Sequence, residues 1–422
     1  MIRIDRVCVW LLIGCLAFLT PSFIVFGFAD EIFSALFGII AFFDCIVNHN
    51  WKKYKLLWIM MAVLTLYAVY STTLGFNTIS SIIIDWVICL KPYIPFMVLY
   101  AVAPTLTETD KKTLRVISII NLAFSSAVLC GGTTVLKAVL SQPYVPGVII
   151  YISACVYLYA SIDSYDKIPY RNLIITIVFL SFGLLCTRSK FYAEYIVTLF
   201  FLFIYKPGIT KHITLGHVTV IAGLCVTVLL ATWQKISYYF LMGNNTTFDA
   251  ETLQSFARPV LYATSGLILW DFFPFGSGLA SFATFASQVN YSNLYYEYGL
   301  DKIHGLSPQM NDFICDAYYP SLAEFGIVGV ILFIWLWSYI YGIIKKLLRA
   351  RMPEKSMDYV IGSLLILFIL IECTSGTTIT QSPGVIAAAL LGLICGKAEK
   401  ISTSEPAKSS SLKNNKLICK KI

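Results

Sequence analysis

Long apolar segments separated by short charged or polar interruptions make up most of this 422-residue sequence. A hydrocarbon core of about 30 Å is crossed by about 20 apolar residues in helical conformation, so each long apolar run is a candidate transmembrane helix. The runs predict an all-α polytopic membrane protein with about twelve spans. They are expected near residues 7–27, 31–47, 56–73, 79–103, 114–139, 145–162, 172–187, 190–205, 216–240, 321–344, 358–376 and 383–396.

Basic residues are concentrated in every second interruption. These interruptions hold Lys52, Lys53, Lys55, Lys111, Lys112, Arg115, Lys167, Arg171, Lys206, Lys211, Lys345, Lys346, Arg349, Arg351 and Lys355. The positive-inside rule places such loops, and with them both termini, in the cytoplasm of a bacterial inner membrane.

This orientation divides the chain into four parts. Residues 1–240 carry spans one to nine, residues 241–320 form one large periplasmic loop, and residues 321–396 carry spans ten to twelve. Residues 397–422 are rich in Lys and Ser and are expected to form a disordered basic tail near anionic headgroups.

The composition agrees with a membrane protein. Hydrophobic residues make up 58% and charged residues 13%, whereas about 25% of a soluble domain is charged. The net charge of +8 would suggest nucleic-acid binding in a soluble protein, but here the basic residues lie on one side of the predicted membrane, so no nucleic-acid partner is expected.

None of the 12 Cys residues form a Cys-x-x-Cys pair, and we expect no metal and no cofactor. Mirrored halves are missing too, which disfavours a transporter without excluding it.

Two cations fall on a turn that the positive-inside rule should leave without them. Arg188 and Lys190, in "TRSK", lie on the predicted outer turn between spans seven and eight. Arg grips phosphate oxygens in bidentate fashion and Lys adds a point charge, so an outer anion such as a lipid pyrophosphate would explain both. The alternative is that Arg188 extends to headgroups or pairs with Glu194. The same argument applies less strongly to Arg258.

The predicted loop is rich in aromatic residues. Tyr291 and Tyr295 offer flat apolar faces with polar edges that suit stacking on sugar rings, or they belong to the loop's own core. His304, the single His of the loop, has a pKa suited to acid–base chemistry, although a lone loop His is often only a surface residue.

Acidic residues gather where the chain re-enters the membrane, at "DAYYPSLAEFGIVG". Asp316 lies just before the predicted span and Glu324 inside it. A carboxylate at that depth is costly and indicates either a function or a basic partner. Asp85 and Lys91 in span four are expected to form a structural ion pair, with a kink at Lys91–Pro92.

Short motifs in a fixed order carry a resemblance to a known family. "TRSK", "ARPVLY", "FPFGSGLASF", "YSNLYYEYGL" and "GLSPQMNDFICDAYYPSLAEFGIVG", over about residues 184–341, resemble the Wzy-type O-antigen polymerases and the related O-antigen ligases. The resemblance implies an enzyme with a large periplasmic loop that joins undecaprenyl-pyrophosphate-linked sugar chains without a metal. It also implies that external Arg residues hold the pyrophosphate, and Arg188 and Arg258 match those positions.

One departure separates the two branches of that family. Ligases commonly carry a His shortly before the "E-x-G" of the following helix, where this chain has Cys315 and Asp316, while His304 lies further back. The "D-x-Y-Y-P" form resembles polymerases more than ligases.

We therefore expect a metal-independent glycosyltransferase that polymerises lipid-linked repeat units into a surface polysaccharide such as O-antigen. Arg188, Arg258 and Asp316 are the expected catalytic residues, with Asp316 as the base. The expected substrate-binding residues are Lys190, Tyr291, Tyr295, His304 and Glu324, of which His304 and Glu324 are second choices for the base. Expected partners are the lipid-linked oligosaccharide, membrane lipid and a chain-length regulator. Ligase and flippase remain as alternatives.

Overall fold

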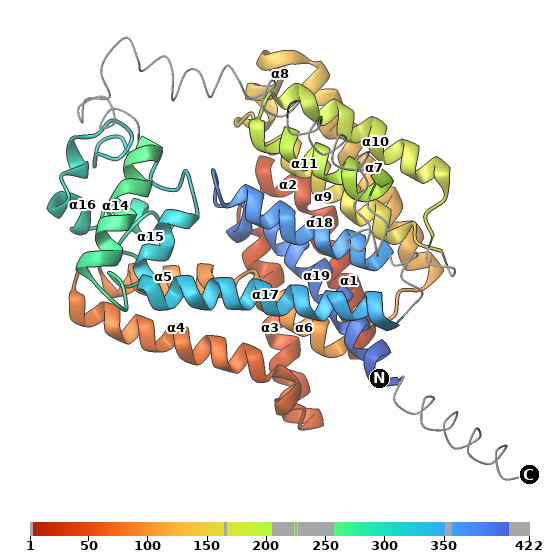
Figure 1. The fold of residues 1–422 in the computed structure, drawn as a ribbon, viewed down its shortest axis with the longest axis horizontal. Coiled ribbons are helices and arrows are strands. Elements are labelled where there is room, and N and C mark those ends of the chain that lie inside the picture. Colours follow the sequence, from red (N-terminus) through yellow and green to blue (C-terminus); the bar gives the residue numbers. More distant parts are fainter. Residues whose placement is uncertain are drawn as a thin grey trace, which may run out of the picture.

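The computed structural model describes residues 3–163, 167–204, 223, 226, 257–350 and 357–404. These residues are predominantly helical and include no β-strand, only one isolated bridge between Ser307 and Met310. The predicted all-α class is confirmed. Figure 1 shows a bundle of helices with a smaller, loop-rich region at one end, formed by the residues around α14, α15 and α16.

The first part of the chain largely follows the expected spans. Its helices are α1 (Ile4–Ala17), α2 (Leu19–Ile24), α3 (Ala29–Asn48), α4 (Lys55–Leu74), α5 (Ile79–Leu90) and α6 (Tyr93–Val102). The break between α5 and α6 falls at Lys91–Pro92, as predicted, because proline has no N–H to continue the helical ladder.

The next helices differ from the prediction at one point. They are α7 (Glu108–Cys130), α8 (Gly132–Leu140), α9 (Val145–Ala160), α10 (Tyr170–Gly183) and α11 (Ser189–Leu199). The span expected at 114–139 corresponds to α7 but ends earlier, at Cys130, because the chain breaks at Gly131–Gly132, where Gly132 has φ +80°. Helices α8 and α9 then meet at 77°.

The last part contains the loop region and three long helices. The loop region holds α14 (Ala257–Asp271), α15 (Phe285–Val289), α16 (Leu294–Glu297) and the 3₁₀ segment η8 (Tyr319–Phe325), and it is followed by α17 (Gly326–Ala350), α18 (Met357–Glu372) and α19 (Ser382–Ser404). Helix α19 passes through Lys397 and Lys400, so the expected disordered tail does not begin at 397. Most of the span expected at 216–240, and residues 405–422 of the tail, lie outside the described residues.

Several helices are suited to crossing a membrane. In the described ranges four are long and apolar enough, namely Trp51–Leu74, Ile79–Val102, Glu108–Cys130 and Tyr319–Leu348, and a fifth results if α8 and α9 form one broken span. Apolar helices of this kind indicate a membrane-embedded protein. The other expected spans stay a prediction.

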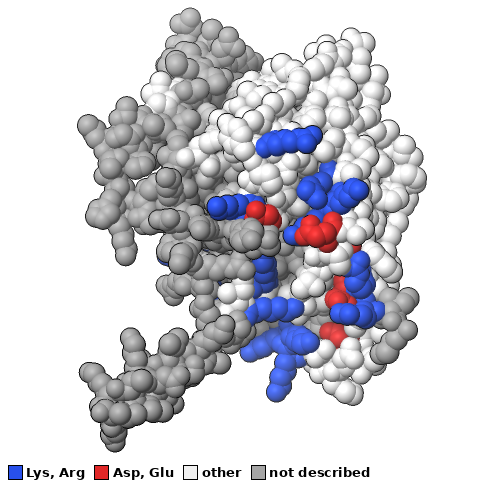
Figure 2. All heavy atoms as spheres, turned by 90° about the vertical axis from the view of Figure 1, so that its right-hand side faces the viewer, with Lys and Arg blue, Asp and Glu red and all other residues white. Residues whose placement is uncertain are grey.

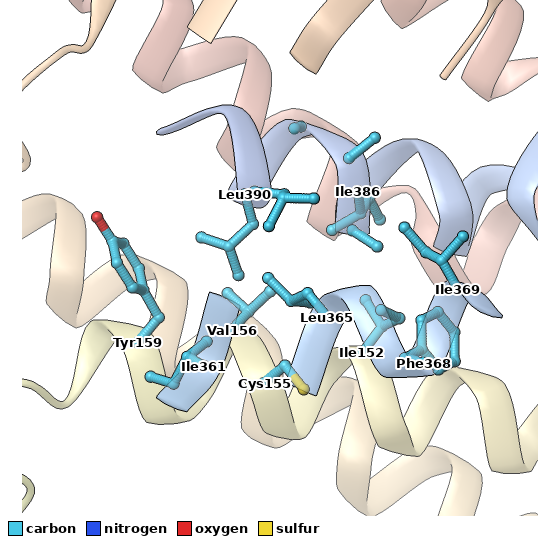
Figure 3. Packing of buried hydrophobic residues seen from close by; sticks show 14 of the residues in the cluster. Ile152, Cys155, Val156, Tyr159, Ile361, Leu365, Phe368, Ile369, Ile386 and Leu390 are labelled. Atoms are coloured by element: carbon cyan, nitrogen blue, oxygen red, sulfur yellow. The ribbon is translucent and has the colours of Figure 1, made fainter. Parts of the chain in front are cut away.

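The main core lies between α9, α18 and α19. Every residue of α9 is buried, and Figure 3 shows Ile152 and Val156 of this helix near Leu365 of α18 and Leu390 of α19. Because α9 is apolar on all sides, other helices surround it.

Two glycines allow α19 to approach α6 closely. Gly392 and Gly396 are one turn apart, and a Cβ on either would overlap backbone carbonyl groups of α6, at Phe96 and Tyr100 respectively. Small residues at such spacing let helix backbones meet, which is how helices associate without a hydrophobic driving force in lipid.

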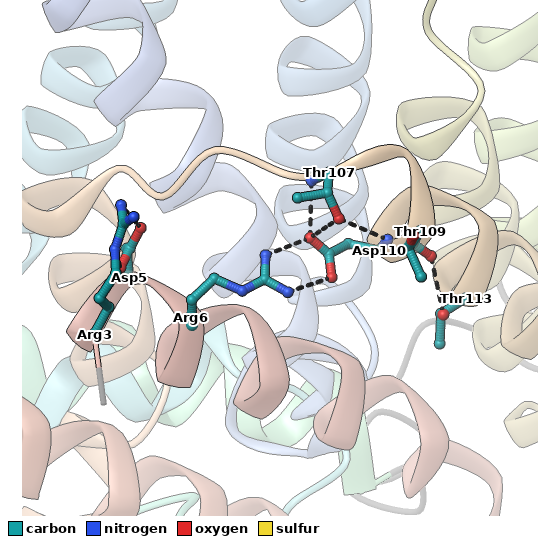
Figure 4. Close-up of polar contacts among 7 residues, drawn as sticks. All are labelled: Arg3, Asp5, Arg6, Thr107, Thr109, Asp110 and Thr113. Carbon is teal, nitrogen blue, oxygen red and sulfur yellow. Dashed lines mark hydrogen bonds and ion pairs between the residues drawn. The ribbon is translucent and has the colours of Figure 1, made fainter. Parts of the chain in front are cut away.

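Basic side chains gather at the end of the bundle where α1 begins and α17 and α19 end. Figure 2 shows this face, with a few acidic side chains among the Lys and Arg. Ion pairs join the helices there: in Figure 4, Arg6 of α1 grips both oxygens of Asp110 (2.7 and 2.9 Å), which with Thr107 also caps α7. Lys346 and Lys397 pair similarly with Glu399 and Asp358.

The close approach of α6 and α19 predicts a cost for added volume. Gly392→Ala should lower stability by about 1–3 kcal/mol, the usual range for overpacking, because the methyl group has no space beside Phe96. Gly342→Ala is the matched control, because Gly342 lies in helix α17 with nothing within 4 Å of its added Cβ. Thermal unfolding in detergent measures both. Equal melting temperatures for the two variants would contradict the packing.

Candidate functional site

The loop region has a hydrophobic core of its own. Leu261 and Ile268 of α14 pack with Phe282, Leu294 and other buried residues of the loop, separately from the main core. The region is therefore an ordered unit built on the helices rather than a loose connection.

Five consecutive backbone amides of this unit, at residues 279–283, donate to side chains. These bonds run from Leu279 to Ser71 Oγ (2.6 Å), from Ala280 to Asp85 Oδ2 (2.8 Å), from Ser281 and Phe282 to Glu324 Oε1 (2.8 Å each), and from Ala283 to the Tyr295 hydroxyl (2.8 Å). All five residues are buried. Because a buried N–H without an acceptor is costly, these side chains are what allow an irregular backbone to lie here.

The segment is also strained. Ala280 and Ala283 both have positive φ (60° and 56°), which costs a residue with a Cβ roughly 1–2 kcal/mol. Gly276 and Gly326 lie so close together that a Cβ on either would meet the other's backbone nitrogen. The "FPFGSG" turn is thus shaped by contact with the start of α17.

Asp85 and Glu324 therefore do not have the partners that the sequence suggested. Lys91 pairs with Asp30 (2.7 Å) and Glu31 (2.5 Å) of α3, so the expected Asp85–Lys91 pair is wrong. Asp85 and Glu324 instead interact with each other and accept backbone N–H groups. Glu324 is fully buried, which places it in the support of the loop.

A second polar cluster lies where α11 begins and α18 ends. Lys190 Nζ donates to Glu372 Oε2 (2.7 Å) and to the Ser375 carbonyl (3.3 Å), and it lies over the ring of Tyr144 at 5.1 Å. Glu194 lies beside both Lys190 and Glu372. Lys190 is nearly buried and already neutralised, so it ties the 187–190 turn to the α18–α19 connection.

Arg258 and Asp316 form an ion pair at the edge of the same cluster, with both side chains half-buried. Arg258 is the second residue of α14, and its Nε is buried without a hydrogen-bond partner among the described residues. Arg188, also half-buried, and Lys190 lie close enough to act electrostatically on the Asp316 carboxyl. The three predicted external cations and the predicted base are thus brought together.

Backbone contacts fix this arrangement. The N–H groups of Tyr318 and Tyr319 donate to the Cys373 carbonyl (3.1 and 3.3 Å), and the Tyr262 hydroxyl of α14 donates to the Thr374 carbonyl (2.8 Å). Helices α17 and α18 run away from this end and back to it, so the cluster lies far from the basic face.

Burial raises the pKa of the Asp316 carboxyl above its ordinary value, and the positive charges of Arg258, Lys190 and Arg188 oppose this effect in part. The carboxyl is therefore a stronger base than an exposed aspartate would be.

The predicted sugar-binding residues Tyr295, Tyr291 and His304 differ in how deeply they are buried. Tyr295 is fully buried, and its hydroxyl is shared between the Ala283 N–H and Ser287 Oγ (2.8 Å each), so it supports the loop core. Tyr291 is half-buried and donates to the Leu306 carbonyl (2.6 Å). His304 is exposed beside Phe313, and among the described residues no contact joins it to the Asp316 cluster.

Sequence reasoning missed Tyr144 and Glu372, which contact Lys190, and Thr378 and Gln381, which interact with Glu372 and Tyr144 respectively. Glu372, near the end of an apolar run, was the available signal, because a carboxylate in such a position needs a partner. Within the described ranges no three His, Cys, Asp or Glu side chains come together as a metal site requires.

Removing the Glu324 carboxylate should destabilise the local structure of residues 279–283. Glu324→Ala leaves the Ser281 and Phe282 amides without an acceptor, at about 1–3 kcal/mol each, whereas Glu324→Gln keeps an acceptor oxygen and should cost less. Hydrogen exchange of peptides covering 279–283 measures this, with exposed Glu297→Ala as the control. Unchanged protection in Glu324→Ala would show that Glu324 does not support the segment.

The Lys190–Glu372 pair predicts a non-additive pair of substitutions. Lys190→Met leaves Glu372 buried without its cation and should cost about 3–5 kcal/mol, whereas Lys190→Met with Glu372→Gln should recover much of that loss. Thermal unfolding of the single and double variants tests this, beside Lys302→Met at an exposed lysine. Simple addition of the two losses would argue against the pair.

No protein-family model matches the sequence, and no curated protein matches it.

Proposed function

We propose that this chain is a lipid-linked repeat-unit polymerase, a glycosyltransferase that extends undecaprenyl-pyrophosphate-linked oligosaccharides into O-antigen or a related surface polysaccharide. The observation that supports this most directly is the grouping of Arg188, Lys190, Arg258 and Asp316 at the end of the bundle opposite its basic face. With the basic face in the cytoplasm, this group faces the periplasm, where finished lipid-linked units are found.

In this proposal the two arginines bind the donor diphosphate. Each guanidinium offers five N–H donors in a planar fork that matches phosphate oxygens, and the Arg258 side chain, which contacts Asp316 through Nη2, is half-buried and not enclosed. Fixed positive charges at a half-buried site stabilise the negative charge that develops as the diphosphate leaves. Lys190, neutralised by Glu372, anchors the turn that carries Arg188 and does not bind the donor itself.

The transfer step follows from the Arg258–Asp316 pair. A diphosphate that binds Arg258 competes with Asp316 for the guanidinium and releases the carboxylate. Asp316 then accepts the proton of the acceptor hydroxyl while the hydroxyl oxygen forms a bond to C1 of the donor sugar. The bond from C1 to the diphosphate oxygen breaks, and undecaprenyl diphosphate leaves with the electron pair.

The finer topology belongs to the same proposal. We propose about twelve spans, with both termini in the cytoplasm of the bacterial inner membrane and the loop of residues 241–320 in the periplasm. Tyr291 and His304 then line the approach of the sugars, a chain-length regulator contacts the protein, and Tyr295 and Glu324 act indirectly by supporting the loop. A ligase would share the donor site and differ in its acceptor.

Lipopolysaccharide ladders of complemented deletion strains test the activity. Arg188→Ala and Asp316→Asn should each remove the long chains and leave a single capped repeat, at normal protein levels, because one loses the anion grip and the other the base. Asp312→Asn, an exposed carboxylate of the same loop, should keep the full ladder. A deletion strain without any repeat would indicate a flippase or ligase, and a normal ladder in Asp316→Asn would exclude that residue as the base.

The raised pKa of Asp316 predicts a pH dependence. A base must be ionised to accept a proton, so polymerisation by the purified protein should decline as the pH falls through that pKa. The decline should begin at a higher pH than an exposed aspartate, with a pKa of about 3.9, would give. The His304→Ala variant should keep the same acid limb. If that variant loses the limb, His304 rather than Asp316 is the titrating group.

A further inference from the structure

We propose that α14 lies in the plane of the membrane–water interface, on the side of the membrane away from the basic face. It contacts lipid through a face formed by Tyr262, Leu267 and Trp270. In the sequence this helix falls within the stretch expected to be a periplasmic loop. The inference concerns lipid contact and holds or fails independently of the proposed reaction.

The helix has two apolar faces. One, with Leu261, Thr264 and Ile268, is buried in the core of the loop region. The other is exposed, with Leu267 56% and Trp270 83% accessible. Exposed Leu and Trp side chains on one face form an apolar patch, and such patches mark sites of contact with another molecule or with a membrane. Trp is also enriched at the level of the lipid headgroups.

This exposed face continues into the outer surface of α4. Phe273 and Phe275 follow α14 directly and are 69% and 51% accessible. The Phe275 ring contacts Tyr70 of α4 at 6.3 Å, and the Tyr70 hydroxyl donates to the Gly276 carbonyl (3.0 Å).

Helix α4 itself belongs to a segment suited to crossing the membrane. Its Leu66 and Val69 are 71% and 60% accessible, as expected of a surface in contact with acyl chains. An apolar surface that is continuous with such a face is covered by the same lipid, so lipid is the occupant we assign to α14.

The length and direction of α14 favour an interfacial position over a spanning one. Its 15 residues reach only about 22 Å, and it is not among the helices apolar and long enough to cross. Figure 1 shows α14 running across the direction of α4 and α17. A short helix with an exposed apolar face and this orientation lies in the interface plane.

Fluorescence quenching in proteoliposomes tests the assignment. The emission component lost in Trp270→Phe should be quenched by phosphatidylcholine brominated near the top of the acyl chain. Quenching should be weaker with bromine near the chain end and with aqueous iodide. Trp337→Phe, at a buried Trp, is the matched control, since its component should respond to none of them.

A second reporter guards against a local effect of the Trp270 substitution. In the Trp270→Phe background, Phe273→Trp should restore a component with the same preference for shallow bromine. Quenching of both reporters by iodide but not by brominated lipid would show that the face is in water. Protection from both quenchers would show that protein covers it. Either result overturns the proposal, whether or not the chain polymerises glycans.

Discussion

Backbone N–H groups that are buried away from water must find acceptors, and this requirement governs how the loop region meets the helices. Residues 279–283 are neither helix nor strand, yet they lie buried between α4, α5 and the start of α17. Their N–H groups donate to side chains from four different elements, namely Ser71 of α4, Asp85 of α5, Glu324 of η8 and Tyr295 of α16. The position of the loop relative to the bundle depends on these bonds.

This support explains why carboxylates lie so deep in an apolar chain. An isolated carboxylate in hydrocarbon is costly. The Glu324 carboxylate, however, accepts two backbone N–H groups that would otherwise be buried without an acceptor, so each group offsets the cost of burying the other. Lys190 and Glu372 solve the equivalent problem at the end of α18, where each neutralises the other. Both sets of buried charge are used for structure. The half-buried Arg188, Arg258 and Asp316 remain accessible to a ligand.

Local patterns in the sequence predicted what depends on nearby residues. Apolar runs gave the helical class, Pro92 marked the break between α5 and α6, and Arg188, Arg258 and Asp316 drew attention as charges at predicted helix ends. What the patterns could not supply was long-range pairing. Lys91 is six residues from Asp85 but bonds to Asp30 and Glu31, about sixty residues earlier, because α3 packs beside the break. Glu372 likewise reaches Lys190 across 182 positions.

The same distinction separates Tyr295 from Trp270. Both are aromatic residues of the predicted loop of residues 241–320, and the sequence pattern alone does not distinguish them. Tyr295 is fully buried because its hydroxyl has two partners inside the loop, whereas Trp270 projects from a helix whose other face already makes the core. A core needs only one face of α14, so the second face, with Leu267 and Trp270, is free for the lipid contact proposed above. Arg258 lies in the first turn of this helix and aromatic residues lie at its end, so the polar group is at one end and the apolar surface runs along its side. In the proposed position α14 would hold the Arg258 guanidinium at headgroup level beside a flank that excludes water, and a fixed positive charge acts most strongly on an anion in such a setting.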